Sequence, residues 1–222
     1  MARLRERQRR QRTEQVLEAA ATLFAERGYN GTHVEAIAER AALAPATVYK
    51  YFSTKPNILL ALAVRHVRSA LPERRRLLRN PPEDPRAAVQ AYEELLADQA
   101  LRHIPKDCWR IILSAPFIEP GGAAARTALR LGSLIRRHYL HLFAFYQQRG
   151  LLRKNVDAAA LADLMLVIGT EHLARLVTSD TLTLADQKRA AARHIDIVFN
   201  GLIAGKKRNR RQDRHAMKER SR

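Results

Sequence analysis

Residues 32–52 read THVEAIAERAALAPATVYKYF, and this run predicts two short helices joined by a tight turn. Thr32 and Glu35 have the spacing of a capping box, which indicates the start of the first helix. Apolar residues then recur on one helical face until residues 42–44, which are expected to form the turn. Pro45 can open the second helix, because the N–H that proline lacks would have no intrahelical partner in a first turn.

Two helices joined by a turn of about three residues form a helix-turn-helix unit. Counted from Val34, the packing of this unit needs a small residue at the fifth position and an aliphatic residue at the fifteenth. Ala38 and Val48 meet both needs, and Val48 and Phe52 are expected to face the core. Ala42 stands at the ninth position, where a turn with positive φ usually has glycine. A left-handed alanine costs on the order of 1 kcal/mol.

Helical patterns continue through the rest of the chain. Strand signals are scarce and apolar residues recur at spacings of three and four, so the predicted fold class is all-α. A first helix is expected over residues 13–27, ended by Gly28, and a helix after the head is expected to be interrupted at Pro72. Asp84 and Thr183 are the expected N-caps of the first and last of the later helices. These later helices are expected over residues 85–102, 106–118, 122–149, 157–178 and 184–204.

The 222 residues suffice for a small N-terminal three-helix head and a larger helical body. Four parts are expected: a basic arm over residues 1–12, a helix-turn-helix domain over 13–55, a body over 56–205 and a flexible basic tail over 206–222.

The net charge of +18 is concentrated at the two ends of the chain. Residues 1–12 and 206–222 together hold 12 of these charges, which suits a nucleic-acid partner. The N-terminal arginines either form an arm that reaches a minor groove or flanking phosphates, or are disordered and only raise non-specific affinity. Neither end has the apolar residues of an interfacial helix, and no stretch is long and apolar enough to span a bilayer. With one cysteine and no secretory signal, a cytoplasmic protein without a membrane partner is expected.

Several motifs of the head keep their spacing across three helices and two turns. They are AAATLFAERGY at residues 19–29, THVEAIA at 32–38 and PATVYKYF at 45–52, followed by Lys55. In these motifs the chain resembles the TetR/AcrR family of transcriptional regulators, over about a quarter of its length. The family usually has glycine at the place of Ala42 and serine at that of Ala44, so this chain lacks a side-chain cap on its third helix.

The resemblance implies a sequence-specific DNA-binding regulator that works as a homodimer on double-stranded DNA. In the family, the third helices of two protomers enter successive major grooves of a palindromic operator, and a small-molecule inducer releases a repressor of this kind. The positions carried over residue by residue, as base or phosphate contacts, are Thr32, His33, Ala46, Thr47, Tyr49, Lys50, Tyr51 and Lys55.

The resemblance also implies that the body dimerises and holds a ligand pocket. The dimer interface is expected at apolar stripes of the last two helices, formed by Leu161, Met165, Ile168, Ile195, Val198, Phe199 and Leu202. The expected pocket residues are Trp109, Phe117, Tyr139, Phe143, Tyr146, Met165 and His172. Both sets have an alternative interpretation as internal core.

The sequence offers little that indicates catalysis or a cofactor. His138 and His141 have helical metal-ligand spacing but no third ligand in the motif, so no metal site is expected. There is no glycine-rich phosphate loop, and Cys108 has no obvious base near it in sequence, so no catalytic residues and no cofactor are expected. Three rival functions remain: a non-specific or RNA-binding basic helical protein, an α-helical enzyme, and a protein of the same fold that acts as an activator or a scaffold and does not repress.

Overall fold

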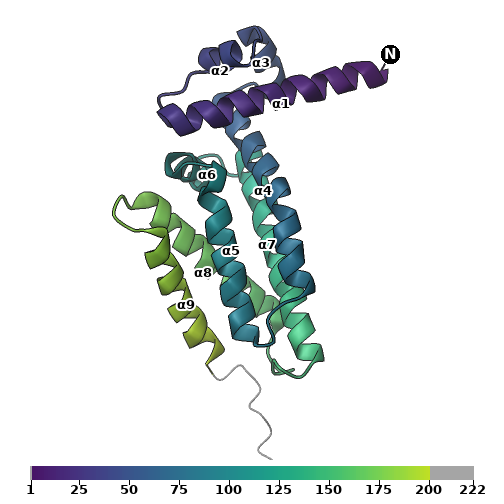
Figure 1. Cartoon of the computed structure of the whole chain (residues 1–222), viewed down its shortest axis with the longest axis vertical. Coiled ribbons are helices and arrows are strands. Elements are labelled where there is room, and N and C mark those ends of the chain that lie inside the picture. The colour runs from purple at the N-terminus through teal and green to yellow at the C-terminus, as the bar shows by residue number, and fades with distance from the viewer. Residues whose placement is uncertain (1, 201–222) are drawn as a thin grey trace, which may run out of the picture.

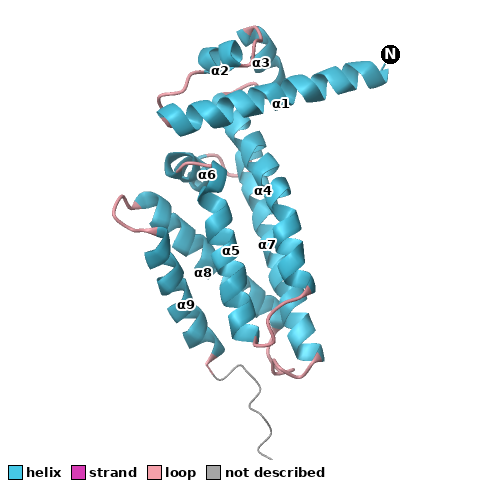
Figure 2. Cartoon of the chain, viewed as in Figure 1, coloured by secondary structure: helices cyan, strands magenta, loops and turns pink. Residues whose placement is uncertain are grey.

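Helices make up all the regular structure of residues 2–200, which are the residues described by this computed structural model. No strand occurs among them, which confirms the all-α class with an N-terminal helix-turn-helix head (Figures 1 and 2). The helices are α1 (Ala2–Arg27), α2 (Val34–Arg40), α3 (Pro45–Phe52), α4 (Lys55–Arg79), α5 (Pro85–His103), α6 (Lys106–Ile118), α7 (Ala123–Gln148), α8 (Ala158–Thr178) and α9 (Leu184–Phe199).

The head of α1–α3 sits at one end of a longer body, and α4 runs from the head into that body (Figure 1). Two clusters of buried apolar side chains hold the molecule together. One fills the head and continues into α6 through Cys108 and Ile112. The other fills the far end of the body around Tyr139 and Phe143. Because α6 belongs to the core of the head as well as to the body, the two parts are packed against each other.

Local signals placed most helix ends correctly. α5, α6, α7 and α8 each begin and end within one residue of the predicted bounds. Gly28 has φ +71° after α1, as a C′ glycine should. Asp84 accepts a hydrogen bond from the backbone N–H of Arg86, and Thr183 forms a full capping box with Asp186. The predicted caps of α5 and α9 are therefore confirmed.

The first helix is longer than the sequence pattern predicted, since α1 begins at Ala2 and not at residue 13. The arginines before residue 13 lie on an exposed helical extension, which projects past the rest of the head (Figure 1). Arginine and glutamate are good helix formers, and Glu6 pairs with Arg10 one turn away at 2.6 Å. The apolar periodicity that marked the helix in sequence is absent from this part because it packs against nothing in the protomer.

The predicted interruption at Pro72 is wrong, since α4 runs through this residue to Arg79. A proline inside a helix removes one backbone hydrogen bond and costs about 3 kcal/mol. Ala70, Arg74 and Leu78 are buried along a single stripe on either side of Pro72. We attribute the continuity of α4 to this packing, which would be lost if the helix ended at residue 71.

Part of the prediction for the C-terminal region lies outside the described residues. This applies to the end of the predicted helix over 184–204, to Leu202 and to the basic tail over 206–222.

Candidate DNA-binding head and ligand cavity

The turn between α2 and α3 has the backbone conformation that the motif requires. Ala42 has φ +53°, and the N–H of Leu43 donates to the carbonyl oxygen of Ala38 at 2.9 Å. Val48 and Phe52 are buried, so the inward face of α3 is as predicted. Ala44 is the N-cap and contributes no side-chain hydrogen bond, as expected from the missing serine.

Ala42→Gly is expected to raise the free energy of unfolding by about 0.5–1 kcal/mol, because the relief of a left-handed alanine exceeds the entropy cost of glycine. Chemical denaturation followed by circular dichroism measures this change. Ala46→Gly is the matched control: Ala46 is exposed within α3, so that variant carries only the entropy cost of glycine and should lower stability. Equal destabilisation by both substitutions would contradict a strained turn.

The outer face of α3 is open to solvent. Ala46 and Lys50 are exposed, Tyr49 is 43% exposed, and Thr47 and Tyr51 are partly buried. The Tyr49 hydroxyl donates to a carboxylate oxygen of Glu35 at 3.1 Å, and this hydrogen bond raises the pKa of Tyr49. The bond joins α3 to α2 and leaves the ring of Tyr49 on the surface.

Glu35 is the partner of Tyr49 because the predicted capping box does not form. The N-cap of α2 is His33, which is exposed and makes no side-chain cap bond. Thr32 is fully buried, and its hydroxyl donates toward the carbonyl oxygens of Gly28 at 2.7 Å and Leu23 at 3.1 Å. The Thr32 side chain therefore fastens the end of α1 and cannot reach a phosphate, which corrects its predicted role.

Lys55 also lies against the head itself. Its Nζ donates to the carbonyl oxygens of Tyr29 and Thr32, both at 3.0 Å, and stands 4.2 Å from the centre of the Tyr29 ring. In this geometry the ammonium closes the loop between α1 and α2. Lys55 thus has a structural role in the head, and its phosphate contact stays a prediction.

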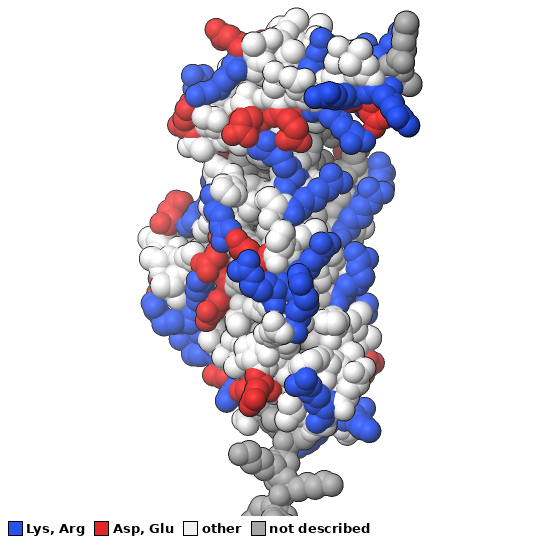
Figure 3. All heavy atoms as spheres, turned by 45° about the vertical axis from the view of Figure 1, so that its right-hand side comes forward, with Lys and Arg blue, Asp and Glu red and all other residues white. Residues whose placement is uncertain are grey.

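Figure 3 shows basic side chains over the head and along the adjoining face of the body, with acidic side chains fewer on this view. The arginines of the α1 extension are exposed, and of these Arg10 is paired with Glu6. A surface of this charge attracts a polyanion such as DNA.

α6 connects the head to the interior of the body. A carboxylate oxygen of Asp107 accepts a hydrogen bond from the backbone N–H of Tyr29, next to Gly28. A Cβ placed on Gly28 would lie 2.9 Å from this carboxylate and would displace it, and the φ of +71° also favours glycine here. Two residues further on, Trp109 is nearly buried and its indole N–H donates to the carbonyl oxygen of Ala100 at 2.7 Å.

The body contains a cavity of about 450 Å³, enclosed by α4–α8 with a contribution from the start of α9. Its wall is mostly apolar, and two of the predicted pocket residues line it: Trp109 from α6 and Phe117, which is 85% exposed at the end of the same helix. The other apolar lining residues include Val67, Leu96, Ile112, Leu113, Ile135 and Leu173. The volume and the apolar wall are those of a small-molecule site.

The remaining predicted pocket residues do not line this cavity. Tyr139, Phe143, Tyr146 and Met165 are buried in the apolar cluster at the far end of the body. His172 is also buried, and its ring nitrogen lies 3.0 Å from that of His194 on α9. The pocket assignment is therefore wrong for these five residues, because side-chain size in the middle helices reports core packing as well as a ligand wall.

Sequence reasoning missed the polar residues of the cavity. They are His66 and Arg74 from α4, Glu93 from α5, Ser133 and Arg136 from α7, Thr170 from α8, and Gln187 from α9. Arg136 pairs with the exposed Asp163 on α8, whereas His66, Arg74, Glu93 and Gln187 are buried. The sequence did hold one signal for these residues, namely a charged residue on the inward face of a helix. Arg74 lies four residues after Ala70 and eight after His66, which are both buried on the same face of α4.

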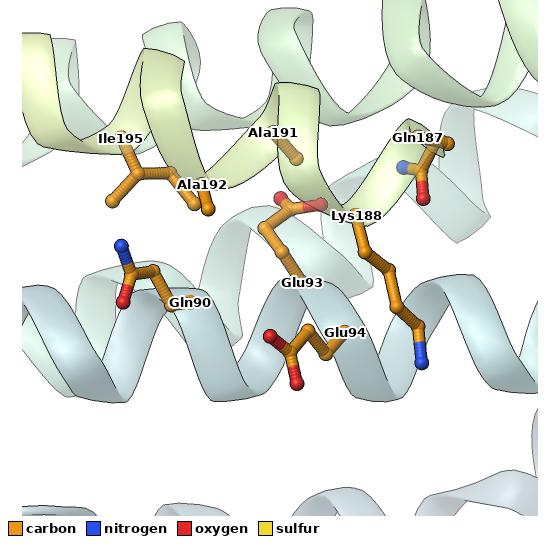
Figure 4. Close-up of a pocket in the computed structure, with 8 residues that line it drawn as sticks. All are labelled: Gln90, Glu93, Glu94, Gln187, Lys188, Ala191, Ala192 and Ile195. Atoms are coloured by element: carbon orange, nitrogen blue, oxygen red, sulfur yellow. The ribbon is translucent and has the colours of Figure 1, made fainter. Parts of the chain in front are cut away.

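Burial sets the charge of two of these groups. It raises the pKa of Glu93 to about 7, although a hydrogen bond from the Tyr139 hydroxyl opposes the rise. Burial likewise lowers the pKa of His66 to about 4, assisted by the nearby His103 and Arg74. Figure 4 shows the Glu93 carboxylate directed from α5 toward α9, where the small residue Ala191 leaves room and Gln187 lies nearby.

The predicted dimer stripe is internal to the protomer. Leu161, Met165, Ile195 and Phe199 are buried in the far cluster, and Ile168 and Val198 pack against it partly buried. The exposed apolar residues of the same helices are Leu164 and Val167 on α8 and Ile197 on α9, with exposures of 44%, 64% and 72%. Helical periodicity had therefore identified the apolar stripe that faces the core of the protomer. The exposed apolar residues lie on a second stripe beside it.

Two kinds of site are absent from residues 2–200. No helix there combines the length and apolarity needed to cross a membrane. No group of three or more histidine, cysteine, aspartate or glutamate side chains is arranged to hold a metal ion.

Comparison with known proteins places the head in a described family. Residues 16–62 match the family model for bacterial regulatory proteins, tetR family. The chain is 34% identical over 91 residues to the HTH-type transcriptional activator FasR of Mycolicibacterium smegmatis. These aligned residues make up 40% of this chain and 42% of that protein. The chain spans less than half the length of the curated relatives it matches.

Solved structures extend the similarity to the body. Thermus thermophilus FadR, a TetR family transcriptional repressor in complex with lauroyl-CoA, has a TM-score of 0.66 at 20% identity and covers 88% of this chain and 97% of that one. A transcriptional regulator from Saccharomonospora viridis in complex with choline has a TM-score of 0.66 at 20% identity, with coverages of 87% and 98%. At this identity the likeness concerns the fold alone.

Proposed function

We propose that this chain is a DNA-binding transcriptional regulator of the TetR family, and that it acts as a homodimeric repressor that a small-molecule ligand releases from a palindromic operator. The observation that carries the proposal is the open outer face of α3, which stands on a buried inner face formed by Val48 and Phe52. A short rigid helix presented in this way fits the major groove of B-DNA.

The proposed DNA contacts lie on α3 and at the start of α2. Lys50 is a candidate for guanine O6 and N7, while Thr47, Tyr49 and Tyr51 are suited to base edges or phosphates. Ala46 allows close approach, and the exposed His33 lies at the N-terminus of α2. Thr32 is left out of this set because its buried hydroxyl is committed to contacts inside the head, whereas Lys55 stays a candidate phosphate contact through the third N–H of its ammonium.

The proposed dimer forms through the outward apolar face of α8 and α9, which carries Leu164, Val167 and Ile197. His194 contacts His172, so it lies on the side of α9 that faces α8. Ile197 is three residues after His194 and therefore lies close to the same side of α9. The apolar positions of the two helices thus flank one seam. A second copy placed here would form a four-helix contact and set the distance between the two α3 helices of the dimer.

The proposed ligand site is the cavity of about 450 Å³, and α6 is the proposed link to the head. Trp109 and Ile112 line the cavity, while Asp107 on the same helix binds the backbone of Tyr29. A ligand that favours one position of α6 would therefore favour one position of the head. The complexes of Thermus thermophilus FadR with lauroyl-CoA and of the Saccharomonospora viridis regulator with choline support a ligand-responsive body.

The test begins with selection of random oligonucleotides by the purified protein at about 150 mM salt, where screening suppresses non-specific attraction. We expect one palindromic motif to be enriched. Lys50→Ala should then weaken binding to that motif by roughly 1–3 kcal/mol in a fluorescence anisotropy titration, because it removes one base contact.

Lys154→Ala is the matched control, since it removes the same charge at an exposed position of the body. Its affinity for the selected motif should stay close to that of the parent. Binding that tracks only DNA length, with equal losses for both variants, would instead favour the rival non-specific binder.

A further inference from the structure

Arg74 is a buried guanidinium without an acidic partner. Only 4% of the residue is exposed, and Arg74 forms no ion pair among residues 2–200. Its Nε donates to the side-chain oxygen of Gln99 at 2.7 Å, and its Nη1 is buried without a hydrogen-bond partner. The neighbouring Glu73 is engaged elsewhere, by Arg102 at 2.8 Å and by Gln99 at 2.9 Å.

Such an arrangement is costly in a free protein. A buried charge normally has an opposite charge or a full set of hydrogen bonds, and an unsatisfied donor on a charged group carries a large desolvation penalty. Arg74 lines the cavity, so a molecule bound there can supply the missing acceptor. Guanidinium groups are suited to carboxylates and phosphates because their N–H donors match the geometry of these anions.

The other polar groups of the cavity do not offset this positive charge. His66 is neutral near pH 7, because burial lowers its pKa to about 4, and both its ring nitrogens lack partners. Burial raises the pKa of Glu93 to about 7, so at neutral pH this carboxyl is protonated for much of the time. Two permanently charged groups thus line the cavity: the guanidinium of Arg136, which Asp163 pairs, and that of Arg74, which has no acidic partner among residues 2–200.

Most of the remaining wall excludes a second charged group on the ligand. Trp109, Ile112 and Leu113 of α6 and Leu131 and Ile135 of α7 present apolar surface to the cavity. An apolar body that fills this space would be stabilised in proportion to the apolar surface that it removes from water.

We propose that the cavity binds an amphipathic molecule with one acidic head group, which Arg74 receives, and an apolar body that lies against α6 and α7. This inference rests on the proposed function, since it names the ligand class of the same cavity. Its test does not use DNA, so its failure can be told apart from failure of the regulator proposal.

Trp109 is the single tryptophan of the chain and lines the cavity, so its fluorescence reports binding directly. Decanoate, decanol and decylamine, each below its micelle concentration, share an apolar chain and differ in head-group charge. At pH 6, where Glu93 is mostly protonated and a simple carboxylate is mostly ionised, we expect decanoate to bind at least about tenfold more tightly than decanol, as a hydrogen bond to a charged group would give, and decylamine to bind most weakly.

Arg74→Met should abolish the preference for decanoate over decanol while binding of decanol is retained. Arg75→Met is the matched control, because Arg75 is exposed on the same helix, and it should bind as the parent does. The ranking of the three probes on the parent protein needs no variant, so it decides the matter even if Arg74→Met does not fold.

Three outcomes would overturn the proposal. Equal affinities for decanoate and decanol would mean that Arg74 does not select the head group. Tightest binding of decylamine would assign recognition to Glu93. Binding of none of the three probes would remove the amphipathic ligand class altogether.

Discussion

The double variant Val167→Glu, Ile197→Glu is expected to be a folded monomer that no longer holds a palindromic DNA site. Both side chains are exposed in the protomer, at 64% and 72%, so glutamate at these positions leaves the core untouched. In the proposed dimer each glutamate would be buried without a partner, at a cost on the order of 3–5 kcal/mol. Two-fold symmetry repeats this cost in the second copy.

Light scattering measures the mass of the variant, and circular dichroism reports its helicity. Ile118→Glu serves as the control, since Ile118 is 77% exposed on α6, away from the proposed interface, and this variant should remain dimeric. Met165→Glu provides the contrast: Met165 is buried in the far cluster, so its substitution should unfold the protomer. A double variant with the mass of a dimer would place the interface elsewhere.

Glu93→Gln is expected to stabilise the protein at pH 8 by up to about 3 kcal/mol relative to the parent. Burial raises the pKa of Glu93 from 4.5 to about 7, so the folded state binds a proton more tightly than the unfolded state. The parent therefore loses stability as pH rises from about 4.5 through about 7. Glutamine has no proton to lose and still offers an oxygen to the hydroxyl of Tyr139.

Urea unfolding of both proteins between pH 5 and pH 8 measures this difference. The advantage of the variant should grow with pH across this window. His66 and His138, whose pKa values burial lowers to about 4, make the opposite contribution as pH falls, but they are present in both proteins and cancel in the comparison. Glu94→Gln is the control, because Glu94 is exposed on the same helix. A pH-independent difference would contradict the assignment to Glu93.

The head was the part of the molecule best predicted from sequence. The positive φ of Ala42 and the buried faces of Val48 and Phe52 followed from motif spacing. The prediction failed at Thr32. Its spacing to Glu35 predicted an N-cap of α2, but its hydroxyl donates to the carbonyl oxygen of Gly28 at the end of α1. A short polar side chain has several backbone partners within reach, and the packing of neighbouring helices selects among them.

The amino-acid sequence alone determined where most helices begin and end, because caps, glycines and prolines act on the backbone within a few residues. It also determined which stripes of α8 and α9 are apolar, but not which of them faces the core. That choice depends on α5 and α7, which are remote in sequence and cover Met165 and Ile195 while Val167 and Ile197 stay outside. The cavity likewise exists only in the tertiary structure, because five helices must meet before Arg74 becomes a buried charge without a partner.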